Sequence, residues 1–586
     1  MKKFNTLITN NKISSFERKD GIFEIFYEDE NYLLNGESRF FDSTKKIATL
    51  INQIIENPTS TLNKIDGEFA FSIFLKKSHK LLLARDHVGF RNLYYFIEDN
   101  KIAVSSNVYD LLSKKTVRAF DINGVIDFLF YEYINDPSTL FKNIFTVERG
   151  TFIRICTKKS KIIDKVMFRK KLSDIAENKF LSEKEIIKNV YDKIIKAHSK
   201  RQSEKNAVLL SGGVDSSIMA LALSQDLGDQ NLVGLSFDTV NAEQSEIYYA
   251  KMVSKKLGIR HEIVQFDPTK SVNLFDIVDN SNVPYIGNIV MSELMTQSTL
   301  DNDYNIFAGQ DTRILTPAWY KIDCFNMRYM NNNVLNIFIK NFGLAAFTIL
   351  GYNSKWKQKV ASRMHSVNDK REYMLKNLFH YHPFADINDK NNVFISKNVK
   401  SKMSQLELND NLLSMHNEYT DMSIGWQHND DIAYMSNSIE RRGFKSSMPF
   451  MDNSLVNFGA SISFNIKSKT TKGKSGYGNK SKKVNKYLLR EAFKDRLPNE
   501  LIFRDKAVAI VNHIFLNEVM GDYIRKNFAS PALKTCDIYE KLDLKILYEK
   551  AMIKNGAWGL KDYHEASELH NLVILDVIAR KYNIVN

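Results

Sequence analysis

The feature that most constrains the fold is one nine-residue stretch, Leu209-Leu210-Ser211-Gly212-Gly213-Val214-Asp215-Ser216-Ser217. The apolar residues 207–210 predict a buried parallel strand, and the apolar residues 218–223 predict a helix. The two glycines predict a tight turn between them. Backbone N–H groups at a turn into a helix N-terminus bind anions, and the three serines add hydroxyl donors. The stretch therefore predicts a phosphate-binding loop. The alternative is an ordinary glycine-rich turn.

Asp215 decides what kind of phosphate site this is, because a carboxylate beside a polyphosphate is best explained by a bridging Mg²⁺. The stretch lacks the Gly-Lys-Ser/Thr of the Walker A loop. It resembles the pyrophosphate loop of the N-type ATP pyrophosphatases, which cleave ATP between the α and β phosphates and transfer AMP. That resemblance implies ATP and Mg²⁺ as ligands. The implied ATP-binding residues are Ser211, Gly212, Gly213, Asp215, Ser216 and Ser217.

The segments after this loop alternate between apolar strand patterns and helical patterns. Residues 232–238 and 262–264 predict two more buried strands, separated by a helix over 246–257. This βαβαβ order predicts a doubly wound parallel sheet whose ligand lies at the carboxyl ends of the strands. Leu209 and Leu235 would then flank the adenine. We expect His261 to shape a helix–strand turn rather than to act in catalysis.

Composition narrows the class of protein. The chain has 586 residues, enough for two or three domains, and its formal net charge is +14. That charge suits an anionic substrate such as ATP. Nucleic acid is less favoured because the basic residues are scattered. Three distant cysteines and no apolar run of membrane-spanning length predict a cytoplasmic protein without disulfides.

The first 168 residues read as antiparallel strands with short turns. Three segments, Asp66-Gly67-Glu68-Phe69-Ala70-Phe71, residues 83–95 and Leu34-Asn35-Gly36-Glu37, resemble the class II glutamine amidotransferase domain of asparagine synthetases. Residues 120–150 resemble the segment that closes that domain. The resemblance implies an α+β amidotransferase-like sandwich of the N-terminal-nucleophile (Ntn) type.

One departure bears on activity. The family releases ammonia from glutamine with a cysteine whose own α-amine is the general base, so that cysteine must be the first residue. Here Lys2 follows Met1, and the first cysteine is Cys156. We therefore expect an inactive amidotransferase domain. The same loss occurs in β-lactam synthetases and lasso-peptide cyclases, whose amine comes from the substrate.

Asp311 is the second candidate metal ligand. Residues 305–309 predict a strand ending in a Gly-x-Asp turn, where the family places a Mg²⁺ carboxylate close to Gly309 and the ATP. The alternative is a helix N-cap. The chain departs from the family at Ala308 and over residues 312–317, so we expect a different substrate pocket. Arg313 would bind a substrate carboxylate or be a structural residue.

Glu440 lies in Ser438-Ile439-Glu440-Arg441-Arg442, which resembles the family's Ser-Leu-Glu-x-Arg word, with 443–447 as an insertion before Pro449. In β-lactam synthetases this glutamate helps to deprotonate the amine. The alternative is a buried glutamate paired with Arg441 or Arg442. The tyrosine partner of that family is absent at Ala308, so Glu440 would act alone or with a residue such as Tyr434.

Lys506 follows Arg504-Asp505 and matches the family lysine that neutralises charge on the α-phosphate and the leaving pyrophosphate. The alternative is a surface lysine paired with Asp505. Residues 467–486 are rich in Lys, Gly, Ser and Asn, which predicts a mobile loop. The last predicted helix, 566–582, is expected to pack on the synthetase domain.

Together these sequence motifs resemble the asparagine synthetase superfamily over nearly the whole chain. We expect an inactive amidotransferase-like domain at 1–168 and an α/β doubly wound ATP pyrophosphatase (PP-loop) domain at 182–586. The resemblance implies an AMP-forming amide-bond ligase that acts on a small molecule or peptide with a carboxylate and an amine. The alternatives are an ammonia-dependent amidotransferase acting on aspartate or a sugar acid, and a non-catalytic binding relative. A homodimer is also compatible with the sequence.

Overall fold

The computed structural model describes residues 5–9, 12–14, 24–28, 31–38, 44–65, 67–131, 134–225, 227, 231–239, 247–266, 273–279, 291, 294–316, 397, 401, 404, 411–427, 432–467, 469–471, 482–483, 486–503, 520–554 and 563–585. Lys506 and the helices that we expect over 334–350, 355–364 and 371–378 lie outside these residues. No helix in the described part is long and apolar enough to cross a membrane.

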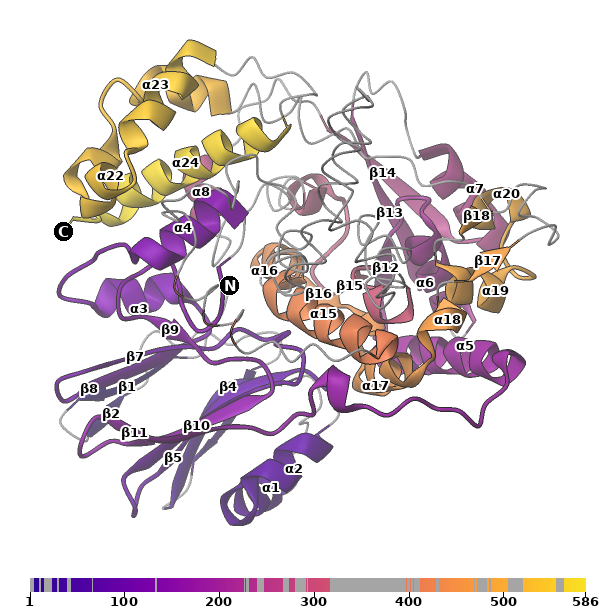
Figure 1. The fold of residues 1–586 in the computed structure, drawn as a ribbon, viewed down its shortest axis with the longest axis horizontal. Helices are drawn as coiled ribbons and strands as arrows, with labels where there is room; N and C mark the ends of the chain where they lie inside the picture. Colours follow the sequence, from indigo (N-terminus) through magenta and orange to yellow (C-terminus); the bar gives the residue numbers. More distant parts are fainter. Residues whose placement is uncertain are drawn as a thin grey trace, which may run out of the picture.

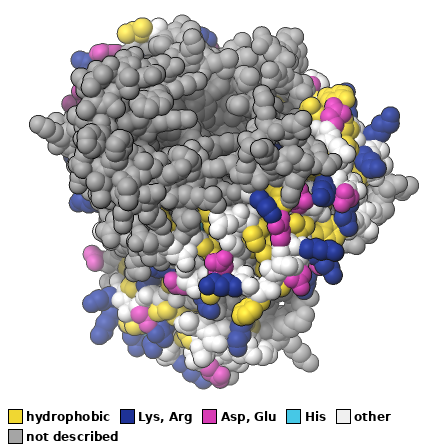
Figure 2. Space-filling view, turned by 45° about the vertical axis from the view of Figure 1, so that its right-hand side comes forward, with side chains coloured by type: hydrophobic (Ala, Val, Ile, Leu, Met, Phe, Trp, Pro, Cys, Tyr) yellow, Lys and Arg dark blue, Asp and Glu magenta, His cyan; other side chains and the backbone are white. Residues whose placement is uncertain are grey.

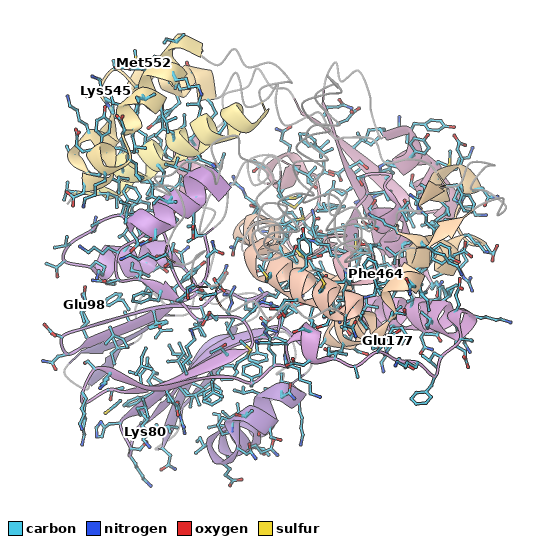
Figure 3. All side chains as sticks on the ribbon, in the orientation of Figure 1. Lys80, Glu98, Glu177, Phe464, Lys545 and Met552 are labelled. Atoms are coloured by element: carbon cyan, nitrogen blue, oxygen red, sulfur yellow. The ribbon has the colours of Figure 1, made fainter. Side chains whose placement is uncertain are left out.

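Two antiparallel sheets form the core of the N-terminal domain (Figure 1). The first has the order β2 (Lys12–Ser14), β1 (Asn5–Thr9), β8 (Lys101–Ser105), β7 (Tyr94–Glu98), β9 (Phe145–Thr146). The second has the order β11 (Lys161–Met167), β10 (Thr151–Cys156), β6 (Lys80–Arg85), β5 (Phe69–Leu75), β4 (Tyr32–Ser38), β3 (Glu24–Glu28). Figure 3 shows Lys80 and Glu98 at outer ends of these strands.

Alternation along β7 shows how the sheets become layers. Tyr95 packs with β8, β6 and β10 between the two sheets, whereas its neighbours Tyr94 and Phe96 face the opposite side. On that side lie α3 (Val108–Lys114) and α4 (Ile122–Tyr131). The other sheet is covered by α1 (Thr44–Glu56) and α2 (Pro58–Lys64). The domain is thus a four-layer αββα sandwich, which agrees with the amidotransferase-like sandwich that the resemblance implies.

The second domain is built on a five-stranded parallel sheet. Its order is β14 (Arg260–Phe266), β13 (Leu232–Thr239), β12 (Asn206–Leu209), β15 (Asn305–Phe307), β16 (Lys445–Ser447). Three helices follow the predicted order: α5 (Glu183–Ser199), α6 (Val214–Ser224) and α7 (Ile247–Leu257). Ser182 and Glu185 form the predicted capping box at the start of α5. The doubly wound α/β fold is confirmed.

The remaining helices pack around this sheet or beyond it. They are α8 (Leu274–Asp279), α15 (Leu412–Gln427), α16 (Ala433–Arg441), α17 (Asn453–Ser461), α18 (Phe464–Lys467), α19 (Tyr487–Phe493), α20 (Asn499–Ile502), α22 (Asp537–Lys541), α23 (Leu544–Lys554) and α24 (Tyr563–Tyr582). Two short strands, β17 (Thr470–Thr471) and β18 (Lys482–Lys483), pair within the segment expected to be a loop. Residues 443–447, which we expect to be an insertion relative to the family segment, contain β16 and so belong to the sheet.

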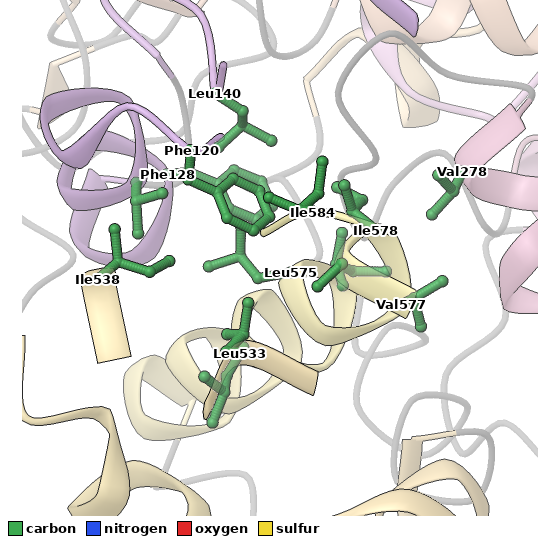
Figure 4. Close-up of a cluster of buried hydrophobic side chains, with 14 of the residues drawn as sticks. Phe120, Phe128, Leu140, Val278, Leu533, Ile538, Leu575, Val577, Ile578 and Ile584 are labelled. Atoms are coloured by element: carbon green, nitrogen blue, oxygen red, sulfur yellow. The ribbon is translucent and has the colours of Figure 1, made fainter. Parts of the chain in front are cut away.

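The C-terminal helices share one apolar core with the N-terminal domain (Figure 4). Phe120, Phe128 and Leu140 of that domain pack with Leu575 and Ile578 of α24. The Asn571 side chain donates a hydrogen bond to the Phe128 carbonyl at 2.9 Å. The helix also contacts α8 of the synthetase half. We expect α24 to pack on the synthetase domain. In the structure α24 packs on the N-terminal domain as well, so it contacts both domains.

Charged side chains of both signs are interspersed over the described part of the face in Figure 2. Exposed lysines and arginines there alternate with exposed aspartates and glutamates, so neither sign gathers into a broad patch on that part of the surface. This mixture agrees with the scattered basic residues of the sequence.

One lysine is buried without a partner among the described residues. Lys467 ends α18, is fully buried, and its Nζ has no hydrogen-bond partner there. Burial lowers the pKa of Lys467 to about 7. The positive charge of Lys467 also lowers the pKa of the buried His416, although burial is the larger cause.

This burial predicts a pH-dependent stability. Between pH 7 and about pH 10 the unfolded chain holds a proton on Lys467 that the folded chain lacks. The free energy of unfolding should therefore rise with pH, by up to about 1.4 kcal/mol per pH unit from this group. Lys467→Met should remove that slope and stabilise the protein most below pH 7. Denaturant unfolding from pH 6 to pH 10 measures both proteins, and equal slopes would contradict the prediction.

Candidate ATP site

The predicted phosphate-binding loop, residues 211–217, lies where β12 ends and α6 begins. Gly212 has φ +70°, a left-handed conformation that favours glycine and turns the chain sharply. The Ser216 and Ser217 hydroxyls donate to the Gly213 carbonyl at 3.1 and 2.7 Å, while Ser211 and Ser216 lie 3.1 Å apart, oxygen to oxygen. These bonds fix the serines around the N-terminus of an eleven-residue helix. The loop has the build of an anion-binding site.

Asp215 lies in the first turn of α6 and is engaged through only one of its oxygens. Lys486, at the N-terminus of α19, forms an ion pair with Oδ2. The other oxygen, Oδ1, is buried and has no hydrogen-bond partner among the described residues. Lys486 itself has φ +59°, an uncommon conformation for a lysine. The sequence did not single out Lys486, although it begins the family-like word Lys486-Tyr487-Leu488-Leu489-Arg490.

Asp311 follows β15, the strand next to β12, so its turn lies at the same edge of the sheet. Its Oδ1 accepts a hydrogen bond from the Arg313 backbone N–H at 3.3 Å and forms an ion pair with the Arg313 guanidinium, whose Nε lies 2.9 Å away. Its Oδ2 is buried and has no partner among the described residues. Between the strands, Gly309 lies against the loop, since a Cβ on it would lie 3.4 Å from the Ser216 nitrogen.

Asp215 and Asp311, which follow two neighbouring strands, thus each have one carboxylate oxygen that is buried and has no hydrogen-bond partner among the described residues. Asp215 Oδ1 and Asp311 Oδ2 are hard oxygen ligands beside a phosphate-binding loop, which is the donor set that Mg²⁺ takes together with phosphate oxygens. Within the described residues no group of three or more acidic, His or Cys side chains forms a protein-only metal site. The residues present therefore fit a magnesium–nucleotide complex better than a metal bound by protein alone.

The other residues expected near the nucleotide have mixed surroundings. Leu209 and Leu235 are register partners in β12 and β13; Leu209 is half-buried and Leu235 is fully buried in the apolar core of the sheet. His261 contacts the hydroxyls of Ser236 and Ser254 at 2.7 and 3.2 Å through its two ring nitrogens. His261 therefore joins β13, β14 and α7, as a residue that shapes this turn should.

Glu440 lies at the end of α16 and is held by a residue of the other domain. Arg91 Nη1 lies 2.7 Å from both carboxylate oxygens, and the Ser446 hydroxyl donates to Oε1 at 2.5 Å. Arg441 and Arg442 are the local partners that we expect for Glu440 if it is structural. In the structure Glu440 pairs with Arg91 of the other domain, whereas Arg442 pairs with Asp276. The role of Glu440 in catalysis stays a prediction.

Arg91 and Glu440 belong to a buried chain of charges across the domain interface. Arg91 also contacts Glu68 at 3.4 Å, Glu68 contacts Arg201 at 3.3 Å, and Arg201 contacts Asp452 at 2.9 Å. Each of these five side chains is at most 8% exposed. A second interdomain group joins Arg149 and Arg169 to Asp421 of α15. The sequence gives no local signal for such pairs, because the partners lie up to 349 positions apart.

Three models of known protein families match this chain. Residues 26–166 match the glutamine amidotransferase domain, residues 186–295 match NAD synthase, and residues 341–567 match asparagine synthase. The phosphate-binding loop falls in the second match, whereas Glu440, Lys486 and Lys506 fall in the third.

The curated relatives that match this chain have related names, and most of them share a low sequence identity with it. Asparagine synthetase [glutamine-hydrolyzing] 1 of Bacillus subtilis is 23% identical over 278 residues, which cover 45% of this chain and 43% of the relative. Amidase chry2 of Gibberella zeae is 25% identical over 37% of this chain and 34% of its own length. An NH(3)-dependent NAD(+) synthetase of Methanocaldococcus jannaschii is 35% identical over 83 residues, 14% of this chain and 32% of the relative. The chain thus matches less than half the length of these relatives.

Solved structures give only distant matches. Glutamine phosphoribosylpyrophosphate amidotransferase from B. subtilis, complexed with ADP and GMP, covers 55% of this chain and 78% of its own at 11% identity, with a TM-score of 0.19. The NH3-dependent NAD synthetase from Campylobacter jejuni covers 39% of this chain and 99% of its own at 15% identity, with a TM-score of 0.18. These scores are too low to establish a common overall arrangement. The amidotransferase and asparagine synthase matches, together with the asparagine synthetase relatives, support the assignment of this chain to the asparagine synthetase superfamily.

Proposed function

We propose that this protein is an ATP-dependent, AMP-forming amide-bond ligase that joins a substrate carboxylate to an amine whose source is not glutamine. One observation carries the proposal. Asp215 and Asp311 lie at the serine-rich loop, and each has one buried carboxylate oxygen without a hydrogen-bond partner among the described residues. Such an arrangement suits the polyphosphate of ATP with its magnesium ion, and the superfamily provides the reaction class.

The first chemical step would be adenylation. A substrate carboxylate oxygen attacks the α-phosphorus of ATP, the bond from that phosphorus to the α–β bridging oxygen breaks, and pyrophosphate leaves. The loop N–H groups and the hydroxyls of Ser211, Ser216 and Ser217 would bind the pyrophosphate. In the second step an amine attacks the acyl carbon, and AMP leaves.

Charge compensation is the main task of the residues around the loop. Asp215 and Asp311 would hold magnesium, which neutralises phosphate charge when bound. Lys486 lies within reach of the same phosphates because it already contacts Asp215. Lys506 is assigned to the α-phosphate by resemblance. Glu440 would serve as proton acceptor for the amine only if its carboxylate exchanged Arg91 or Ser446 for the substrate.

The amine source follows from the N-terminal domain. Cys156, its only cysteine, lies inside β10, so its nitrogen is an amide and cannot act as the base that activates its own thiol. A substrate that carries its own amine, as in peptide or β-lactam-like cyclisation for a natural product, fits this loss. Both cysteines in the described part of the chain are free, which fits a cytoplasmic enzyme.

A second candidate is an ammonia-dependent asparagine synthetase, because two relatives are named asparagine synthetase [glutamine-hydrolyzing] while Cys156 of this chain is not placed to hydrolyse glutamine. Release of AMP and pyrophosphate from Mg·ATP separates the two, with aspartate as acyl donor and ammonia or glutamine added in turn. Asparagine formed with ammonia but not glutamine would identify the second candidate. Turnover with glutamine would contradict the proposed amine source.

The proposed ligase should release pyrophosphate only when a peptide or amino-acid precursor with both functional groups is added. Trapping the acyl-adenylate with hydroxylamine shows which carboxylate is activated. If no carboxylate substrate caused release and Mg·ATP did not bind at equilibrium, the chain would be a non-catalytic binding relative.

A further inference from the structure

Arg313 occupies a position in the candidate ATP site that the superfamily resemblance does not explain. Arg313 lies within residues 312–317, where this chain departs from the family, and two positions after the candidate metal ligand Asp311. Arg313 is only 8% exposed, so its guanidinium is not a surface group. Its Nε contacts Asp311 Oδ1 at 2.9 Å, and its Nη1 hydrogen-bonds to the Ser423 hydroxyl of α15.

The consequence is a fixed orientation of the Asp311 carboxylate. Both Arg313 contacts, from the backbone N–H and from the guanidinium, fall on Oδ1, which leaves Oδ2 as the open oxygen. Asp311 also has φ +61°, a left-handed conformation that costs free energy outside glycine. A strained backbone and a buried cation therefore hold one carboxylate in one orientation.

The support for Arg313 extends into the N-terminal domain. Ser423 lies on α15 two residues after Asp421, which pairs with Arg149 and Arg169 at 2.7 and 3.1 Å. These three side chains are each at most 11% exposed. The helix that holds the Arg313 guanidinium is thus itself fixed by buried ion pairs.

We propose that Arg313 is a positioning residue that presents Asp311 Oδ2 to the magnesium ion of bound ATP. This rests on the proposed function and assigns Arg313 to the metal ligand rather than to a substrate carboxylate. Residues that orient a metal ligand typically contribute 10- to 100-fold to metal affinity, by order of magnitude.

Metal binding at equilibrium tests this without turnover. Mn²⁺ is titrated into the full-length protein with α,β-methylene ATP, an analogue that cannot be cleaved at the reacting bond, and free Mn²⁺ is followed by electron paramagnetic resonance. Arg313→Leu, which removes the guanidinium but keeps a side chain suited to burial, should weaken Mn²⁺ binding roughly 10- to 100-fold. Arg313→Lys should recover part of the loss. Arg154→Leu, which removes an exposed arginine of the other domain, should bind as wild type.

A milder variant tests the same role if Arg313→Leu does not fold. Ser423→Ala removes one support of the guanidinium and should weaken Mn²⁺ binding in the same direction but by less. Wild-type affinity in both Arg313→Lys and Ser423→Ala, or in a folded Arg313→Leu, would overturn the role of Arg313. If the wild-type protein itself bound no Mn²⁺ with the analogue, the proposed function would fail instead.

Discussion

Asp215→Asn should abolish the part of ATP affinity that depends on magnesium. The substitution keeps the shape of the side chain but removes the charge that the open Oδ1 offers to a cation. We expect Mg·ATP to bind on the order of 100-fold more weakly, while metal-free ATP binds the variant no worse than wild type, because Lys486 is released from its ion pair. Calorimetry with α,β-methylene ATP, with Mg²⁺ or with a chelator, measures both affinities.

Lys486→Met is the matched control for this result. It removes the cation on the other side of the same ion pair, so nucleotide binding should weaken with and without magnesium alike. An Asp215→Asn protein whose magnesium dependence equals that of wild type would rule out Asp215 as a metal ligand.

Arg91→Met should destabilise the protein by about 3–5 kcal/mol, since it leaves a buried carboxylate without its cation. Arg91 binds both oxygens of Glu440 at 2.7 Å, and the two side chains are 3% and 8% exposed. Denaturant unfolding followed by tryptophan fluorescence measures the loss. Adding Glu440→Gln to Arg91→Met should recover part of it, because the uncompensated charge is gone.

Arg154→Met provides the comparison for Arg91→Met. Arg154 pairs with Asp164 on the neighbouring strand, but the side chains are 40% and 30% exposed, so its loss should cost less than about 1 kcal/mol. Equal losses for the two variants would mean that burial of the interdomain pair contributes nothing.

Local patterns predicted the parts of this fold that depend on neighbours in sequence. The capping box at Ser182, the strand–loop–helix at residues 209–217 and the parallel order of the sheet were all predictable, because each rests on spacing within a few residues. The sequence also placed Asp215 and Asp311 after two different strands, and the structure makes those strands neighbours in the sheet. The role of the two aspartates as metal ligands stays a prediction.

Long-range contacts could not be predicted in the same way. β16 is a three-residue strand of Lys, Ser and Ser, which carries no strand signal until β15 pairs with it. Nothing near Arg91 in the sequence indicates Glu440, and nothing near Asp215 indicates Lys486. Such pairs form only in the tertiary structure, so a single sequence does not predict them.

The shared apolar core has a consequence for the synthesis of the protein. The amidotransferase-like domain leaves the ribosome before the synthetase domain, yet one face of its sandwich packs against helices that end at residue 582. Between Phe141 and Leu569 of that core lie roughly 430 residues, which take about 20–90 s to translate at typical rates. Until α24 emerges, the apolar side chains of α4 remain exposed to water. The nascent chain should therefore bind chaperones that recognise apolar segments until α24 has been translated.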